Sequence, residues 1–361
     1  MELENKKSIV PLDIHLKIAN FKFKITLDFM LEIANIAIKS NSYKDARNLI
    51  KKIYGQEISC ERIRNVTNLI GEIVYSYDCK KANEAIDLHN AKKIKFTNEI
   101  DEVYYLEMDG SYINTRVKND TNSSWSENKL CIAFNSKNLQ KYRDKDGEIQ
   151  YRIKKAEYIS TFGSVEEFKK HVLAQAIRDN YNNYKYMAII SDGATWIRKL
   201  REEFFPFAQQ ILDIYHLFEN TSTFLNTVYD DKTKINNLKE EWFELLEEGE
   251  WMKVLKDLEK FKDTKMPPGV VNLYNYIMNN SDMIDYPTYR QKYLFIGSGA
   301  IESGNKYVVK QRLCLGGMRW LREKAQLVLS LRCKEYSHLW DLVVILCKLY
   351  FKILELNNSN E

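Results

Sequence analysis

The chain has 361 residues, of which 45% are hydrophobic and 29% charged, so it can form two or three domains with cores of their own. A formal net charge of +4 is too small to identify a nucleic-acid-binding protein without local clusters of basic residues. The six cysteines include no Cys-x-x-Cys pair, which argues against a zinc ribbon. With no apolar signal segment at the start, we expect a cytoplasmic protein with reduced thiols.

Residues 1–100 are predicted to be helical and to contain a helix-turn-helix. Apolar residues between 46 and 53 recur at helical spacing, and Gly55 ends this helix. Ser59 can cap a second helix, whose polar face would offer four side chains to a DNA groove: Arg62, Arg64, Asn65 and Asn68. An ordinary helical hairpin would show the same pattern, so both interpretations stay open.

Residues 101–216 are predicted to form an α/β domain with a mixed sheet. Strands are expected over 103–108, 129–134, 151–161, 186–191 and near 209–214, with hairpin loops at 119–128 and 144–147. Ser164 and Glu167 form a capping box that begins a helix ending near Asp179, and a second helix is expected over 194–203.

Residues 217–296 are predicted to be all helical, with a break at Pro267-Pro268-Gly269, and residues 297–361 supply the last helices of the α/β domain. The most apolar stretch lies at 339–356. Asp341, Lys348 and Lys352 interrupt it, which favours a buried or amphipathic helix over a membrane span.

Two predicted strands end in Asp-Gly, at Asp109 and at Asp192. A carboxylate at the end of a buried strand lies at the rim of the sheet, where open α/β sheets bind ligands. Asp-Gly is also a common turn pair, so either pair alone would indicate little. Two pairs in one predicted domain favour a site.

A third acid, Glu302, lies among three glycines in the segment 297–304. Ser298 can cap a helix there, and an acid in the first turn would complement the helix dipole. The glycines would also allow a phosphate chain or a metal to approach the backbone closely.

Four stretches carry a family resemblance: Met108–Ile113, Ile190–Ile197, Asp213–His216 and Gly297–Trp320. They are similar to bacterial insertion-sequence transposases of the DDE superfamily, and in particular to a transposase-related group of uncharacterised proteins. Residues 42–59 also resemble the helix-turn-helix of that group. The likeness runs from about Pro11 to near the C-terminus. It implies an RNase H-like α/β fold, a mixed sheet with an all-helical insertion over 217–296, preceded by the DNA-binding region 1–100.

The resemblance also implies a role for each acid. Asp109 corresponds to the first catalytic acid, on the first strand of the core, and Asp192 to the second, at the end of the fourth strand. Glu302 corresponds to the third, on a helix after the insertion. Three such carboxylates can hold two Mg²⁺ (or Mn²⁺) ions, which activate the attacking oxygen and stabilise the leaving oxygen of a phosphodiester.

Further residues have supporting roles by the same resemblance. Asp213 and His216 match an Asp-x-x-His element, in which the histidine could contact a phosphate, support a metal ligand or be purely structural. Lys306, Lys310 and Arg312 follow Glu302 and would neutralise DNA phosphates, although a solvated basic helix would look alike. Trp320 and Trp196 are expected in the core.

The predicted function is that of a DDE transposase that cuts and joins DNA at insertion-sequence ends. Its partners would be double-stranded DNA, both element ends and target, and a second copy of the chain, with no membrane. We expect it near the bacterial nucleoid. Two alternatives stay open: an RNase H-like nuclease without strand transfer, and a catalytically inactive DNA-binding remnant, since relatives usually have a further N-terminal segment.

Overall fold

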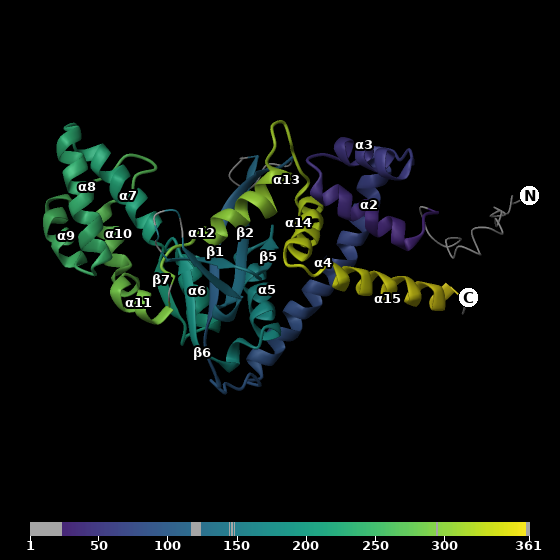
Figure 1. Cartoon of the computed structure of the whole chain (residues 1–361), viewed down its shortest axis with the longest axis horizontal. Coiled ribbons are helices and arrows are strands. Elements are labelled where there is room, and N and C mark those ends of the chain that lie inside the picture. The colour runs from purple at the N-terminus through teal and green to yellow at the C-terminus, as the bar shows by residue number, and fades with distance from the viewer. Residues whose placement is uncertain are drawn as a thin grey trace, which may run out of the picture.

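The computed structural model describes residues 24–116, 124–143, 145, 147, 149–293 and 295–358. Of the predicted hairpin loops, residues 119–123, 144 and 146 lie outside the described residues. The loop predicted over 119–128 is wrong at its end, because a strand begins at Trp125. Figure 1 shows a central sheet between two groups of helices, which confirms a mixed α/β protein. Among the helices described, none combines the length and apolarity needed to cross a bilayer.

The central sheet has five strands in the order β5-β2-β1-β6-β7. These are β1 (Ile100–Asn114), β2 (Trp125–Asn135), β5 (Glu157–Thr161), β6 (Tyr184–Ser191) and β7 (Gln209–Leu212). β1 pairs in parallel with β6, and β6 with β7, whereas β2 is antiparallel to both β1 and β5. The sheet is therefore mixed, and only β2 runs against the other four strands.

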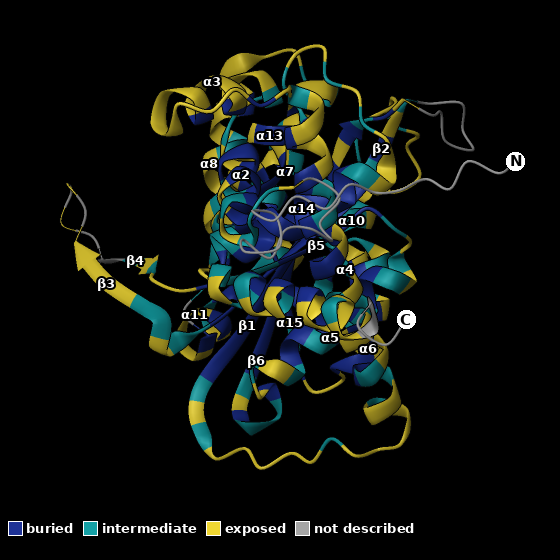
Figure 2. Cartoon of the chain, turned by 90° about the vertical axis from the view of Figure 1, so that its right-hand side faces the viewer, coloured by how far each residue is buried: buried dark blue, intermediate teal, exposed yellow. Residues whose placement is uncertain are grey.

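The single strand predicted over 151–161 is wrong. The chain forms two strands there, β4 (Ile149–Ile153) and β5, and β4 pairs with β3 (Leu139–Arg143) in a separate hairpin. Figure 2 shows this hairpin projecting from the body of the molecule. The N–H of Lys154 donates to the carbonyl of Asn138 at 2.8 Å, and this bond holds the chain where it leaves the hairpin for the sheet.

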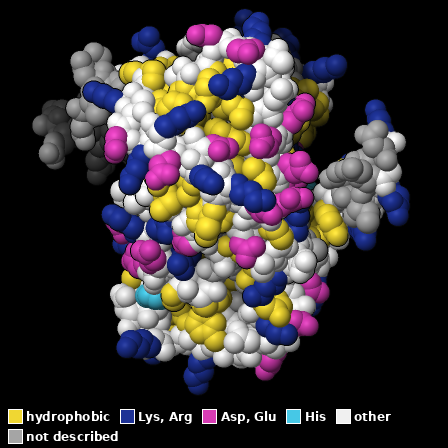
Figure 3. Space-filling view, turned by 90° about the vertical axis from the view of Figure 1, so that its left-hand side faces the viewer, with side chains coloured by type: hydrophobic (Ala, Val, Ile, Leu, Met, Phe, Trp, Pro, Cys, Tyr) yellow, Lys and Arg dark blue, Asp and Glu magenta, His cyan; other side chains and the backbone are white. Residues whose placement is uncertain are grey.

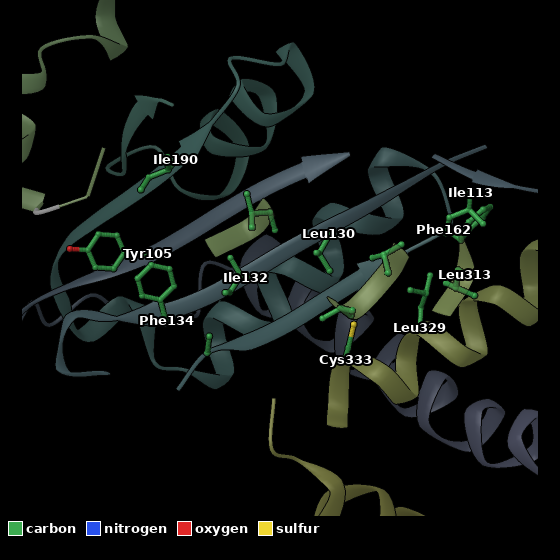
Figure 4. Packing of buried hydrophobic residues seen from close by; sticks show 14 of the residues in the cluster. Tyr105, Ile113, Leu130, Ile132, Phe134, Phe162, Ile190, Leu313, Leu329 and Cys333 are labelled. Carbon is green, nitrogen blue, oxygen red and sulfur yellow. The ribbon is translucent and has the colours of Figure 1, made fainter. Parts of the chain in front are cut away.

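Helices cover both faces of the sheet. One face packs against α5 (Val165–Arg178) and α6 (Thr195–Phe204). The other packs against α12 (Gly299–Gly304), a π-helix (Asn305–Lys310), α13 (Gln311–Leu313) and α14 (Arg322–Tyr336). Figure 4 shows this second face, where Leu130 and Ile132 of β2 point toward α14 and its Leu329 and Cys333.

The N-terminal helices pack with the C-terminal ones. The N-terminal helices are α2 (Leu27–Lys39), α3 (Tyr43–Tyr54) and α4 (Cys60–Asn90). They pack beside the C-terminal helices α14 and α15 (Trp340–Asn358). The predicted helix ends are confirmed: Gly55 ends α3 with a φ of 68°, and the Ser59 side chain accepts the N–H of Arg62 at 3.1 Å at the start of α4. α4 continues for 31 residues and so also packs along α5.

A helical lobe follows β7, at the left of Figure 1. It contains α7 (Ile214–Val228), α8 (Lys232–Glu247), α9 (Trp251–Leu258), α10 (Leu273–Asn279) and α11 (Tyr286–Tyr293). The predicted break at 267–269 falls between α9 and α10, as expected. Figure 3 shows acidic and basic side chains intermixed on the outer face of this lobe, so that face has no single-sign surface for DNA.

Candidate functional site

Asp109 lies within β1, and Asp192 directly follows the neighbouring parallel strand β6. The strand end predicted at Asp109 is wrong, because β1 continues to Asn114. The last registered pair of β1 and β6 is Glu107 with Ile190, and each aspartate comes two residues later. Neighbouring strands are about 4.8 Å apart. Burial raises the pKa of Asp109, and the negative charge of Asp192 raises it further. The structure thus brings these two acids together at one edge of the sheet.

The loop after β6 holds Asp192 in a defined geometry. The carboxylate of Asp192 accepts the N–H of Ala194 at 2.9 Å, and its carbonyl accepts the hydroxyl of Tyr276 at 2.8 Å. Gly193 has a φ of 87°, and a Cβ there would lie 2.8 Å from the side-chain oxygen of Asn280. Glycine is therefore required by both conformation and space, which explains the Asp-Gly pair at this position.

Asp213 and Glu107 fix the start of α12, the helix that carries Glu302. Asp213 is buried after β7 and accepts the N–H of Tyr215 at 3.0 Å, the N–H of Ser298 at 3.3 Å and the hydroxyl of Ser298. Glu107 is buried on β1 and accepts the N–H of Ile301 at 2.9 Å. The two carboxylates therefore accept hydrogen bonds from backbone N–H groups around the start of the helix, where such groups have no partner within the helix.

Glu302 is exposed, and its charge acts on Glu107, two residues before Asp109 on the same face of β1. Burial, together with the charges of Asp213 and Glu302, raises the pKa of Glu107 to about 8, against the opposing effect of the N–H groups of Ile301 and Ala300. Glu107 is therefore mostly neutral at pH 7. It serves as a buried cap for α12 rather than as a further negative ligand.

Asn305 connects the helix of Glu302 to Asp109 directly. It is 2% exposed at the first position of the π-helix, and its amide nitrogen donates to the Asp109 carboxylate at 2.6 Å. Its side-chain oxygen is buried and has no hydrogen-bond partner. π-helical turns often occur at functional sites. An unpaired acceptor oxygen beside two carboxylates is a feature that a cation would satisfy.

The donor set at this edge of the sheet suits Mg²⁺ or Mn²⁺. Asp109, Asp192 and Glu302 offer carboxylate oxygens, Asn305 offers an amide oxygen, and hard divalent cations prefer such ligands. Lys310, on the exposed side of the π-helix, is close enough for its charge to lower the pKa of Asp109. The types of donor atom therefore fit divalent ions. Among the described residues, however, Asp109, Asp192 and Glu302 do not bring one carboxylate oxygen each to within 4.8 Å of one another.

His216 and Asp213, predicted to support the site, differ in environment. His216 is partly exposed on α7, with Nδ1 3.9 Å from the carboxylate of Glu219, and its charge lowers the pKa of Asp109. It is therefore near the acids. Asp213 makes three hydrogen bonds, to Tyr215 and Ser298. Its role is therefore to hold the start of α12 in place.

The predicted DNA-binding residues of α4 meet a loop from the other end of the chain. A cavity of about 600 Å³ separates Arg64, Asn65 and Asn68 from Arg319 and Trp320. Its wall also includes Tyr43, Arg116, Arg312 and Lys324. Three atoms of its lining residues are buried without a hydrogen-bond partner: the Tyr43 hydroxyl, the Asn68 oxygen and one terminal nitrogen of Arg312. Basic side chains and unpaired polar atoms therefore gather in one place.

Arg312 is buried rather than exposed with the other predicted basic residues. Its guanidinium lies over the rings of Tyr43 and Trp320, 4.8 and 5.0 Å from their centroids, and donates to the carbonyl of Ala37 at 3.3 Å. Arg62, Lys306 and Lys310 are exposed. Trp320 and Trp196, expected in the core, are both only partly buried.

Sequence reasoning did not single out Glu107 or Asn305 as site residues. Glu107 had one signal, an acid inside the apolar run 103–108, where a buried charge needs a partner. Asn305 stands three residues after Glu302, one helical turn away on the same face. Neither signal identifies the residue that is contacted, because Glu107 and Ile301, like Asp109 and Asn305, are almost 200 residues apart in the chain.

The comparison with known proteins gives a family but no activity. Residues 2–315 match UPF0236, an uncharacterised protein family, and this match covers most of the chain. No curated protein matches the sequence. The chain belongs to the UPF0236 family.

Proposed function

We propose that this member of the UPF0236 family is a metal-dependent DDE transposase that cuts and joins DNA, with Asp109, Asp192 and Glu302 as its catalytic acids. One observation carries the proposal. Asp109 of β1 is near Asp192, which follows the neighbouring parallel strand β6, and the helical segment of the third acid is bonded to β1 through Glu107 and Asn305.

The arrangement of the chain supports an RNase H-like core. Asp109 lies on the first strand of the five-stranded sheet, and Asp192 follows its fourth strand in chain order, β6. Helices α7–α11 come between β7 and α12, where the resemblance places an all-helical insertion. The proposed domains keep the predicted limits of 1–100, 101–216, 217–296 and 297–361.

The three acids would hold divalent ions, Mg²⁺ or Mn²⁺, together with the amide oxygen of Asn305. When bound, such ions lower the pKa of an attacking water or hydroxyl and stabilise the leaving oxygen of a phosphodiester. The chain itself provides positioning and charge. Asn305 holds the Asp109 carboxylate, Glu107 holds the first turn of α12, and Lys310 offers a positive charge to a phosphate beside Asp109.

β1 connects the acids to the proposed DNA-binding surface. Arg116 follows β1 and donates its N–H to the carbonyl of Trp320 at 2.8 Å. At about 3.4 Å per residue, the basic cavity lies roughly 20 Å along the strand from Asp109. A DNA duplex crossing both would place phosphates at Arg64, Arg319 and Lys310. We propose a homodimer on DNA, because synapsis of two ends requires two active sites.

Cleavage and joining of a labelled DNA fragment with Mg²⁺ test the proposal. Wild-type protein is expected to cut only when the metal is present. Asp192→Asn and Glu302→Gln should each lower the rate by at least about 100-fold, since each removes a ligand of the ions. Asp263→Asn, in an exposed loop of the helical lobe, is the matched control and should not change the rate.

Three outcomes separate the candidate functions. Strand-transfer products together with cut ends support a transposase. Cut ends without joined products identify a nuclease of the same chemistry. Sequence-selective DNA binding without cleavage in Mg²⁺ or Mn²⁺, unchanged by Asp192→Asn, would refute the enzyme and leave a DNA-binding remnant.

A further inference from the structure

A second cluster of metal-ligand side chains lies between α4 and α5, near the edge strand β5. We propose that Cys79, Glu167 and His171 bind a zinc ion that links α4 to α5. One ligand atom from each residue lies within 4.8 Å of the other two, and Cys79 Sγ is 4.0 Å from His171 Nε2. At a tetrahedral zinc site, bonds of about 2.3 and 2.1 Å place sulfur and nitrogen roughly 3.5 Å apart. Closing the sulfur–nitrogen pair on an ion therefore needs about half an ångström, and the Glu167 carboxylate needs to move by at most about 1.3 Å.

Helix geometry places these ligands on facing surfaces. Glu167 and His171 are four residues apart on α5, so their side chains share one face of the helix. Cys79 comes from α4, which packs against α5. The cluster thus combines two ligands one turn apart on one helix with a third from the neighbouring helix. Such a chelate requires no unusual backbone conformation.

Tyr75 orients two of the ligands. It lies one helical turn before Cys79, its hydroxyl donates to the Glu167 carboxylate, and its ring stacks on His171 with centroids 6.1 Å apart. Supporting hydrogen bonds of this kind are typical around metal ligands. Ser164 caps α5 as predicted, since its side chain accepts the N–H of Glu167 at 3.1 Å, while the Glu167 carboxylate accepts the hydroxyl of Tyr75.

The donor atoms favour zinc over magnesium. A thiolate, an imidazole and a carboxylate suit Zn²⁺, whereas the all-oxygen set around Asp109 suits Mg²⁺. Burial lowers the pKa of His171, which leaves a neutral imidazole able to ligate at pH 7. Zinc binding would release the proton of the Cys79 thiol to solvent as the sulfur–metal bond forms.

The charges around the cluster are balanced. Asp78 and Glu167 raise the pKa of His171, while Lys334 and Lys170 lower it. Lys334 also forms a buried ion pair with Asp78 at 2.7 Å, so Asp78 is held by another partner. A cavity of about 420 Å³ is lined in part by His171 and Tyr75. The chain therefore offers three ligands, and a water would take the fourth position of a tetrahedral zinc site.

Zinc here would connect two functional parts of the fold. α4 carries the DNA-facing residues at its start, and α5 packs against the sheet strands β2 and β5. An ion that joins the two helices would fix the DNA-binding end relative to the sheet. This inference does not depend on the proposed transposase activity, because the ligands are separate from Asp109, Asp192 and Glu302.

The test is metal binding by the full chain carrying Asp192→Asn, which weakens the acidic site. Chelator-treated protein is titrated with Zn²⁺ by calorimetry and with Co²⁺ by absorption, where a thiolate ligand gives a charge-transfer band. We expect one ion per chain, a thiolate band with Co²⁺, and no competition from excess Mg²⁺. Cys79→Ser and His171→Gln should each weaken binding by about 100-fold or more.

Cys60→Ser is the matched control, since Cys60 is another partly buried thiol on α4 and lies outside the cluster. It should keep both affinity and band. Equal zinc affinity in wild type, Cys79→Ser and Glu167→Gln would overturn the proposal, as would a Co²⁺ complex without a thiolate band. The wild-type band decides the matter even if a ligand variant fails to fold.

Discussion

Replacing Glu107 tests how the helix of Glu302 is held to the sheet. Glu107→Ala removes a fully buried side chain and the acceptor of the N–H of Ile301. The N–H of Ile301 also donates to the carbonyl of Ser298 at 3.1 Å, so it keeps a partner when Glu107 is removed. The N–H of Ala300 also bonds to Glu107, and we count the loss of this bond as about one buried hydrogen bond. Such a loss costs roughly 1–3 kcal/mol. The cavity left by the carboxyl and one methylene adds about 1–2 kcal/mol.

Glu107→Ala should therefore lower the free energy of unfolding by about 2–5 kcal/mol. Glu107→Gln keeps the size and an acceptor oxygen, and Glu107 is mostly neutral at pH 7, so its cost should stay below about 1 kcal/mol. Urea unfolding at pH 7 measures both. If Glu107→Gln lowers the free energy of unfolding as much as Glu107→Ala does, the charge of Glu107 is what stabilises the fold. The assignment of Glu107 as a neutral cap would then be wrong.

Three further predictions follow from particular contacts. Asn305→Ala should fold normally but lower DNA cleavage by about 10–100-fold, since Asp109 loses its amide donor; cleavage at the wild-type rate would exclude Asn305 as a positioning residue. Arg64→Ala should weaken binding to all DNA sequences and reduce the slope of log affinity against log salt by about 1, whereas an unchanged slope would remove it from the phosphate contacts. Gly71→Ala should destabilise the fold by about 1–3 kcal/mol, because its Cβ would lie 2.8 Å from that of Leu327; denaturation at the wild-type midpoint would contradict this packing of α4 against α14.

Local signals in the sequence predicted the position of Asp192 and the helix ends. The apolar run before Asp192 ends with β6, and Gly55 and Ser59 mark where helices end and begin, because each signal depends on residues within one turn. The strand end predicted at Asp109 is wrong, because pairing with β2 continues β1 to Asn114. The same local rules predicted one strand over 151–161. They failed there because pairing with β3 or with β2, rather than local preference, divides the segment into two strands.

Contacts between distant segments could not be predicted in this way. Glu107 meets Ile301 and Asn305 meets Asp109 only after the sheet and the final helices have packed together. The Cys79 cluster draws its ligands from α4 and α5, 88 residues apart, so it leaves no metal-binding motif in the sequence. The length of α4 was missed for a similar reason, since its second half is stabilised by α5 and α14.

The most direct test of the central claim is a crystal structure of the protein with a DNA oligonucleotide and Mn²⁺, examined for anomalous scattering. The account predicts manganese within about 2.2 Å of carboxylate oxygens from Asp109, Asp192 and Glu302, beside a DNA phosphate. Manganese bound only elsewhere, or a Glu302 carboxylate that remains outside coordination distance with DNA in place, would contradict a three-acid catalytic site.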